Sequence, residues 1–195
     1  MDVIPPLRNS PGFTLFELLI VMLIVGIFAA LGIPSFKYVT SSNRMSSEVN
    51  SLLGDMQYAR SEAVKQGQTI TVCTSSNPTS ATPSCSGSSS WNVGWIVFID
   101  ANSNQTVDTG EQTIRVQTAF TGTDTFSGGA GTSAVTFNRE GYASAYASPT
   151  PVTLPVAITL HSAPVNDQWT RCIALSFAGM PSTMMYGATT PAACS

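Results

Sequence analysis

The segment DANSNQTVDTGE, residues 100–111, contains the side chains whose spacing is most typical of a metal site. Its oxygen-bearing side chains follow the twelve-residue pattern of calcium loops: Asp100, Asn102, Asn104, Asp108 and Glu111. However, Gln105 stands where such loops need a glycine for their sharp turn, and the flanking segments are typical of strands rather than helices. We therefore favour a turn in which Asp and Asn side chains bond their own backbone, with calcium binding as the alternative.

The four cysteines could bind zinc or form disulfides. They fall in two well separated sets without a C-x-x-C motif, and the chain has one histidine, His161, so the sequence lacks the clustered ligands of a tetrahedral zinc site. Four cysteines allow three disulfide connectivities. We predict the local pairs, Cys73 with Cys85 and Cys172 with Cys194, formed in an oxidising compartment, and keep buried free thiols as the alternative.

Catalytic residues are not apparent in the sequence. His161 ends a predicted strand, and no Ser-His-acid set, paired carboxylates or phosphate-binding glycine loop can be placed around it. The glycine-rich segment SGGAGTS, residues 127–133, precedes a strand rather than a helix and is better interpreted as a turn. We therefore predict a protein that is not an enzyme and that needs no cofactor.

The composition disfavours nucleic acid as the default partner. Only 10% of the 195 residues are charged, the net charge is −3 and the isoelectric point is about 4.9, so there is no basic excess. The length suits one domain with an accessory segment.

An apolar run near the amino terminus contains a single carboxylate, Glu17. Residues 18–33 carry no charge, and with residues 13–16 the run reaches the ~20 residues that span a bilayer. A helix dipole favours an acid in the first turn, but a charged side chain in a membrane still costs about 2.5–3.5 kcal/mol and normally has a partner. We expect Glu17 to have such a partner, with a carboxylate tolerated at the membrane interface as the alternative.

The sharpest break between polar and apolar sequence lies before this run rather than after it. A short polar leader, MDVIPPLRNSPG, ends at Gly12. A secretory signal would instead be cleaved after the apolar core, at a small-x-small pattern that FAALG at 28–32 imitates weakly. Pro34 follows the run; because proline lacks a backbone N–H and clashes with the preceding turn, we predict a helix kink near residues 32–35.

The block GFTLFELL, residues 12–19, resembles the class III signal of type IV prepilins and type II secretion pseudopilins. This resemblance implies that a prepilin peptidase cleaves after Gly12 and methylates the new amino terminus, Phe13. It also implies that Glu17 pairs with the amino terminus of a neighbouring subunit in an assembled filament. Pro34 resembles the position at which the amino-terminal helix of pilins bends.

Beyond Pro34, apolar residues recur at alternating intervals of four and three, which predicts one buried face of a helix. These residues are Met45, Val49, Leu52, Met56, Ala59 and Ala63. Charged residues fall mainly off this stripe, and Gly67 is a plausible end of the helix. We predict one long kinked helix over 13–66 whose second half packs on a sheet.

After Gly67 the sequence contains strand-like segments rich in Val, Ile, Thr and Phe. We predict strands at 68–74, 94–100, 113–120, 133–141, 155–162 and 171–179. A long helix followed by such strands indicates an α+β fold rather than repeated βαβ units. We therefore predict a pilin-like α+β fold, with a leader peptide at 1–12, a transmembrane and assembly half of the helix at 13–36, and an antiparallel β-rich globular domain at 37–195.

Three internal blocks resemble in particular the GspH/FimT (FimU-like) group of minor pilins and pseudopilins: YARSEAVKQGQTITVC, NVGWIVFIDANSN and AVTFNREGYA. This resemblance implies a minor pilin that initiates or caps a type IV pilus. Its partners would be other major and minor pilins or pseudopilins and the prepilin peptidase/methyltransferase. It would cross the inner membrane once with a periplasmic globular domain, and then join an extracellular filament.

Two alternatives share this leader and fold. One is a pseudopilin of a type II secretion machine; the other is a DNA-binding competence pilin of the FimT type. The FimT type is associated with a carboxy-terminal G-R-x-R motif, and the equivalent residues here are Gly179, Met180, Pro181 and Ser182. Because binding to phosphates depends on cations and both arginines are absent, we disfavour DNA as a partner.

Overall fold

The computed structural model of the protein describes residues 12–195, apart from the side chains at positions 32–35 and 37. The chain divides into two compact units between Thr40 and Ser41, four residues after the domain boundary that we predicted. Residues 1–11 of the predicted leader lie outside the described part of the chain.

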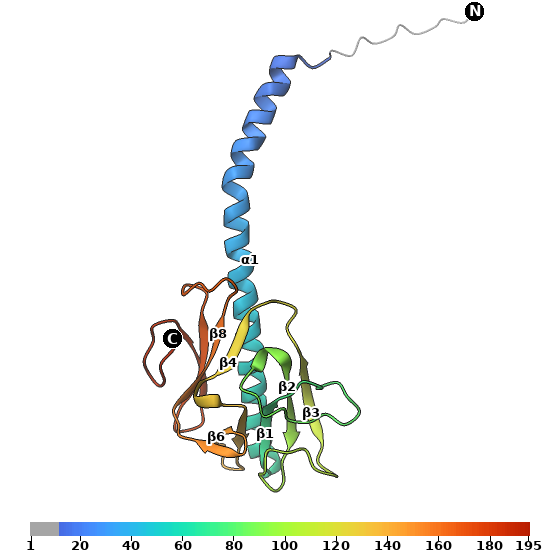
Figure 1. Cartoon of the computed structure of the whole chain (residues 1–195), viewed down its shortest axis with the longest axis vertical. Helices are drawn as coiled ribbons and strands as arrows, with labels where there is room; N and C mark the ends of the chain where they lie inside the picture. Colours follow the sequence, from blue (N-terminus) through green and yellow to red (C-terminus); the bar gives the residue numbers. More distant parts are fainter. Residues whose placement is uncertain (1–11) are drawn as a thin grey trace, which may run out of the picture. The chain divides into compact units, whose positions relative to one another are not determined.

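One long helix, α1 (Leu15–Gln66), begins in the first unit and continues through the second (Figure 1). It begins two residues later than predicted and ends at the predicted residue. The side chain of Pro34 lies outside the described residues, and the backbone assignment as helix continues through its position. The kink therefore stays a prediction.

The second half of α1 buries the predicted apolar stripe. All six stripe residues, from Met45 to Ala63, are at most 2% exposed. They belong to one core cluster with side chains from both sheets, for example Val135 and Ile173. The helical period in the sequence thus identified the face of α1 that packs against the sheets.

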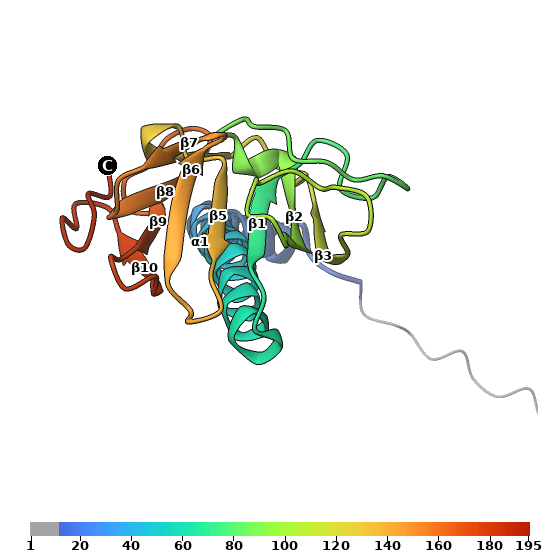
Figure 2. The same cartoon turned by 90° about the horizontal axis from the view of Figure 1, so that it is seen from below.

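In the part of the chain that the structure describes, ten strands form two antiparallel sheets, most of which can be followed in Figure 2. The six-stranded sheet has the order β3-β2-β1-β5-β6-β7 and the four-stranded sheet the order β10-β9-β8-β4. The strands of the first sheet are β1 (Ile70–Thr74), β2 (Gly94–Ile99), β3 (Thr113–Thr118), β5 (Ala134–Phe137), β6 (Ala143–Ala147) and β7 (Thr150–Val152). Those of the second are β4 (Thr125–Gly128), β8 (Val156–His161), β9 (Arg171–Leu175) and β10 (Pro181–Met185). Two short 3₁₀ helices, η1 (Trp91–Val93) and η2 (Gly129–Gly131), lie in the connections.

The six predicted strands correspond to β1, β2, β3, β5, β8 and β9, and four strands were missed. Two of the missed strands, β7 and β10, contain proline, which is depleted in strands because it cannot donate to a ladder. Another, β6, has the sequence ASAYA, in which small residues replace β-branched ones. The strand conformation of β6 is therefore stabilised by its pairing with β5 and β7 rather than by local propensity.

We expect a fragment of residues 41–195 to fold without the first 40 residues, because it retains the whole apolar stripe and both sheets. In this fragment, Leu52→Ala should lower the free energy of unfolding by about 2–5 kcal/mol, since Leu52 is fully buried. The exposed Gln57→Ala is the control and should change it by less than about 0.5 kcal/mol. Urea unfolding monitored by tryptophan fluorescence measures both. A fragment without a cooperative transition would contradict the expectation.

Candidate functional site

The predicted cleavage site lies in an exposed segment that precedes α1. Gly12, Phe13 and Thr14 have no regular secondary structure, and Phe13 is 82% exposed. Apart from its two neighbours in the chain, no described residue lies within 4 Å of the position that a Cβ on Gly12 would take. Exposed segments outside helices and strands are the preferred substrates of proteolysis, so the peptide bond after Gly12 is accessible.

Thr14 caps the start of α1. Its Oγ1 accepts a hydrogen bond from the backbone N–H of Glu17 at 3.2 Å, and its carbonyl accepts one from Leu18. This is the first half of a capping box, in which Ser or Thr is followed three residues later by Glu or Gln. Sequence reasoning explained Glu17 through the helix dipole and missed the cap, although the T-x-x-E spacing was visible. Glu17 therefore sits in the first turn, with its side chain exposed.

The first half of α1 exposes apolar side chains in almost every direction. Fourteen large apolar residues between positions 13 and 31 are 41–84% exposed. They are Phe13, Leu15, Phe16, Leu18, Leu19, Ile20, Val21, Met22, Leu23, Ile24, Val25, Ile27, Phe28 and Leu31. Glu17 is the carboxylate among them.

We predicted a transmembrane segment over 13–36. Within the described residues, no helix combines the length and the apolar character that crossing a bilayer requires.

A buried carboxylate joins the second half of α1 to the first sheet. Asp55 is 8% exposed; its Oδ2 accepts a hydrogen bond from Trp95 Nε1 at 2.8 Å, and its Oδ1 pairs with Arg115 Nη1 at 2.7 Å. The Arg115 guanidinium also lies 4.0 Å from the centroid of the Tyr58 ring. Asp55 thus fixes β2 and β3 against α1. The sequence placed Asp55 among the charged residues that fall mainly off the apolar stripe, because periodicity does not reveal a partner on another element.

A second group of charges joins Arg44 and Glu48, earlier on the same helix, to Asp124, which directly precedes β4. Asp124 forms an ion pair with Arg44 at 2.8 Å and accepts a hydrogen bond from the backbone N–H of Ala163 at 2.9 Å. Glu48 is 6% exposed, and its Oε2 has no hydrogen-bond partner among the described residues. Burial raises the pKa of the Glu48 carboxyl, the charge of Asp124 raises this pKa further, and Arg44 partly opposes both.

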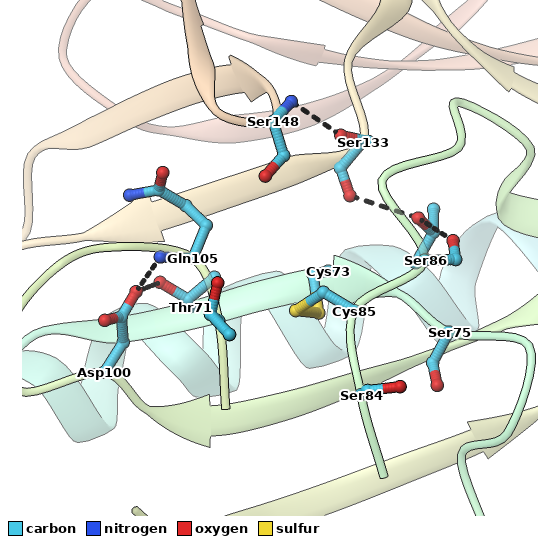
Figure 3. Close-up of a disulfide and its surroundings, with 12 residues drawn as sticks. Thr71, Cys73, Ser75, Ser84, Cys85, Ser86, Asp100, Gln105, Ser133 and Ser148 are labelled. Carbon is cyan, nitrogen blue, oxygen red and sulfur yellow. Dashed lines mark hydrogen bonds between the residues drawn. A yellow bond between two sulfur atoms is a disulfide. The ribbon is translucent and has the colours of Figure 1, made fainter. Parts of the chain in front are cut away.

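The loop with calcium-like spacing covers the outer face of the first sheet. Val107 packs on a small cluster that contains Phe98 and Ile96. Asp100 is buried at the end of β2; its Oδ2 accepts hydrogen bonds from Thr71 Oγ1 at 2.7 Å and from the Gln105 N–H at 3.0 Å (Figure 3).

The remaining oxygens of this loop also have partners inside it. Asp108 Oδ2 accepts from the side-chain amides of Asn102 and Asn104, each at 2.8 Å. The Glu111 carboxylate accepts from the backbone N–H groups of Ala101 and Asp108, each at 2.9 Å. The turn interpretation describes bonds from Asn side chains to nearby backbone, and two are present: Asn102 Oδ1 accepts from the Asn104 N–H at 3.2 Å, and Asn104 Oδ1 accepts from the Thr106 N–H at 2.8 Å.

The turn forms without the glycine that we had considered necessary. Gln105 takes a φ of 60° in the left-handed region, and Ser103 a φ of 58°. The objection to calcium based on Gln105 was therefore too strong. Across residues 12–195, however, the described side chains include no group of three or more His, Cys, Asp or Glu that could hold a metal ion.

Both disulfides join the cysteines that are near in sequence. Cys73 pairs with Cys85 and Cys172 with Cys194, with Cα–Cα distances of 5.6 and 5.8 Å. The first ties the polar loop after β1 to the outer face of the first sheet (Figure 3). The second ties the carboxy-terminal tail to β9. These are the predicted pairs.

The remaining candidates take structural positions. His161 ends β8, and its Nδ1 lies 3.3 Å from Thr170 Oγ1. Gly179 and Met180 form the turn before β10, and Pro181 and Ser182 begin that strand. Gly179 has a φ of 73°, and a Cβ there would lie 2.3 Å from the backbone N of Ala143, so this position requires glycine.

The fold and its amino terminus together define the class of this protein. The first half of α1 has a capped start and exposes apolar side chains, and the second half packs on antiparallel sheets. This is the arrangement of a pilin. The model of the family described as "Type II transport protein GspH" matches residues 48–179, and that described as "Prokaryotic N-terminal methylation motif" matches residues 7–33. The chain belongs to the GspH family.

One solved structure supports the fold. The crystal structure of the type IV minor pilin FimU of Pseudomonas aeruginosa (strain PAO1) in space group P21 is 20% identical, covers 80% of this chain and 99% of that chain, and has a TM-score of 0.52. The match to the P65 crystal form of FimU is also 20% identical, covers 77% of this chain and 99% of that chain, and has a TM-score of 0.48. No curated protein matches this chain.

We expect Asp55→Ala to lower the free energy of unfolding by about 1–3 kcal/mol, because the indole N–H of the buried Trp95 loses its acceptor. Asp55→Asn keeps an acceptor oxygen and removes only the charge that pairs with the half-exposed Arg115. It should therefore have a smaller effect. Urea unfolding measures both variants; equal losses would contradict the role of the indole hydrogen bond.

Glu48 should reduce stability as the pH rises. Its folded-state pKa is raised, so the folded protein binds the proton more tightly than the unfolded chain, and the free energy of unfolding falls from about pH 4.5 upward through the folded-state pKa. Glu48→Gln should be more stable than the unmodified protein at pH 7, and this gain should vanish near pH 4.

Glu62→Gln is the matched control for the titration of Glu48. Hydrogen bonds from Gln66 and Lys65 lower the pKa of Glu62, so its contribution has the opposite sign and is lost as the pH falls. This variant should show no gain at pH 7. Unfolding at a series of pH values distinguishes the two, and a Glu48→Gln gain independent of pH would contradict the assignment.

Proposed function

We propose that this protein is a minor pilin that initiates or caps a type IV pilus after cleavage following Gly12 and N-methylation of Phe13. The observation that carries this proposal is the apolar first half of α1, with its many exposed side chains beside one carboxylate. Apolar surface of this extent on a helix needs an apolar environment or a partner. The match to the methylation motif supports the processing step.

The chemistry of Glu17 suits contact between subunits. In its own chain Glu17 lies in the first turn of α1, and Thr14 already satisfies its backbone N–H. An exposed carboxylate among apolar side chains is stabilised by an opposite charge when water is excluded. After cleavage, the amino group of Phe13 in a neighbouring subunit would supply that charge. Glu17 would then set the axial position of each subunit in the filament.

We also propose where the protein resides. Before assembly, the first half of α1 would anchor the chain in the inner membrane with the globular unit in the periplasm. After assembly, the same half would pack among the helices of other major and minor pilins in an extracellular filament. The disulfides support this location, since such bonds form and persist in oxidising compartments.

A pseudopilin of a type II secretion machine is the second candidate. The description of the matching family, a type II transport protein, favours it, and the leader and fold would be the same. In that case the partners would be other pseudopilins, and the protein would not appear in surface pili. Sheared surface filaments therefore distinguish the two candidates.

The test compares two variants in cells that make pili. In the unmodified protein and in Glu17→Ala, mass spectrometry should find a mature chain that begins at a methylated Phe13, because removing a charge makes membrane insertion easier. Gly12→Val should leave the uncleaved precursor. Sheared filaments should contain the unmodified protein and lack Glu17→Ala.

Other results would decide against specific parts of the proposal. A mature chain that begins near Leu31 would contradict prepilin processing. Normal recovery of Glu17→Ala in filaments would remove the pairing role of Glu17. Correct processing without any protein in sheared filaments would favour the secretion pseudopilin.

A further inference from the structure

In the described part of the chain, three of the four edge strands of the two sheets carry a feature that limits further pairing. β7 has three residues and contains Pro151, and β10 begins at Pro181, beside a small apolar groove against the last turns of α1. Proline cannot donate to a neighbouring strand, which limits pairing at an edge. β4 is covered by the segment before η1, because the Gly128 N–H donates to the Ser89 carbonyl at 2.8 Å.

The fourth edge strand, β3, lacks such protection. It is the longest of the four, six residues with the sequence TIRVQT, and contains neither proline nor glycine. Among the described residues, β3 pairs with β2 alone (Figure 2), and no hydrogen bond joins its backbone to a loop. The N–H and C=O groups on its outer side are therefore a template for an added strand.

The side chains of β3 alternate between the two faces of the first sheet. Pairing with β2 is regular over residues 115–118, after a register shift at the start of β3. Arg115 lies on the inner face, where it pairs with Asp55 of α1. Val116 lies opposite Ile96, a member of the cluster on the outer face, and is 50% exposed. A strand added next to β3 would therefore place one of its side chains beside Val116.

An open cleft of about 830 Å³ lies beside Val116. Its walls are the loops 78–83 and 107–112, and Thr113 and Val116 of β3 also line it. Val107 contributes an apolar side chain that packs on the outer face of the sheet. The cleft is thus placed to receive an outward side chain of an added strand, and its lining next to the edge favours an apolar one.

The acids of this cleft have no cation as a partner. Asp108 and Glu111 line the cleft, and their carboxylates accept hydrogen bonds from amide groups of their own loop. No Lys or Arg of the described chain forms an ion pair with either acid. The segment 100–111 contains three acids and neither Lys nor Arg. Charge complementarity therefore favours a strand that carries Lys or Arg next to its apolar residue.

We propose that the edge of β3 accepts an extended, basic segment of a different pilin in the same filament. The segment adds a strand to the first sheet, places a β-branched side chain beside Val116, and pairs a Lys or Arg with Asp108 or Glu111. The proposal deepens the proposed function, on which it rests, by naming a contact of the globular unit and the chemistry of its partner.

The same observations disfavour a second copy of this chain as the partner. The one cation of its own open edge, Arg115, is already held by Asp55 and is not available to the acids of the cleft. Because the other edges limit pairing, the sheet is extended once, and the contact does not propagate from copy to copy. This suits a subunit that joins a filament built with other pilins.

Peptides that form a strand test the edge, with the full-length protein in detergent. The probe is Lys-Thr-Val-Thr-Val-Thr-Lys; its matched controls are Glu-Thr-Val-Thr-Val-Thr-Glu and Lys-Thr-Val-Pro-Val-Thr-Lys. We expect the basic peptide to slow amide hydrogen exchange at residues 113–118 and not at 181–185, because it adds main-chain hydrogen bonds to β3. The acidic peptide should bind about tenfold more weakly by fluorescence anisotropy. The proline peptide should give no protection, since it cannot complete the ladder.

Variants of the protein test the charges. Asp108→Asn should weaken binding of the basic peptide about two- to fivefold, as expected for an exposed ion pair. Asp167→Asn, which changes an exposed acid in the connection between β8 and β9, is the matched control and should leave the binding unchanged. The proposal is overturned by exchange that the basic peptide does not slow at β3, by equal binding of the basic and acidic peptides, or by equal effects of the two variants.

Sheared filaments identify the partner. A benzophenone amino acid replaces Val116, and cells that make pili are irradiated. Mass spectrometry should find a cross-link to a segment of another pilin that contains Lys or Arg next to Val, Ile or Thr. A cross-link to a second copy of this chain, or to no other pilin, would overturn the proposal. Protection of β3 by the peptide, in a protein that is absent from filaments, would contradict the proposed function alone. Presence in filaments without that protection would contradict the pairing at β3 alone.

Discussion

The packing of one helix face under two sheets is the interaction on which the rest of this structure depends. The stripe from Met45 to Ala63 meets side chains of both sheets in a single core, so neither sheet can be removed without exposing it. Ala59, Ala63, Leu52 and Met56 are all at most 1% exposed in this core. Because burying such side chains supplies most of the favourable free energy of folding, this half of α1 is a scaffold. The other half exposes its apolar side chains.

The polar groups around this core give the packing its register. Asp55 is satisfied by Trp95 and Arg115, both from strands distant in sequence, so its two hydrogen bonds form only when α1 and the first sheet are correctly aligned. Glu48 is different, since it is buried beside Asp124 without a partner for one oxygen. A buried acid of this kind lowers stability at neutral pH. The contrast between Asp55 and Glu48 shows that burial alone does not decide what a charged side chain contributes to the stability of the fold. The number of its hydrogen-bond and ion-pair partners decides it.

The proposed assembly separates two kinds of surface on one chain. The amino-terminal half of α1 offers a long apolar surface with one carboxylate, which is suited to non-directional packing with positional control by Glu17. The globular unit offers a small apolar groove between α1 and β10 and the open edge of β3, which suit directional contact. The apolar surface of the helix would supply affinity through its buried area. The globular unit would supply orientation, because charge complementarity serves specificity more than affinity.

The sequence by itself determined the features that depend on neighbours along the chain. The helix and its buried face follow from the 3.6-residue period, the six strongest strands from β-branched residues, and the two disulfide pairs from the spacing of the cysteines. The family resemblance rested on residues 12–19 and on three internal blocks. Only the tertiary structure decided the pairing of β4, β6, β7 and β10, the partners of Asp55, and the placement of the groove between α1 and β10. The partners of Asp55 and the pairing of β4 with β8 join residues far apart in sequence, which leave no local motif. Strands β6, β7 and β10 pair with strands next to them in sequence, but their small residues and prolines give no strand-like pattern.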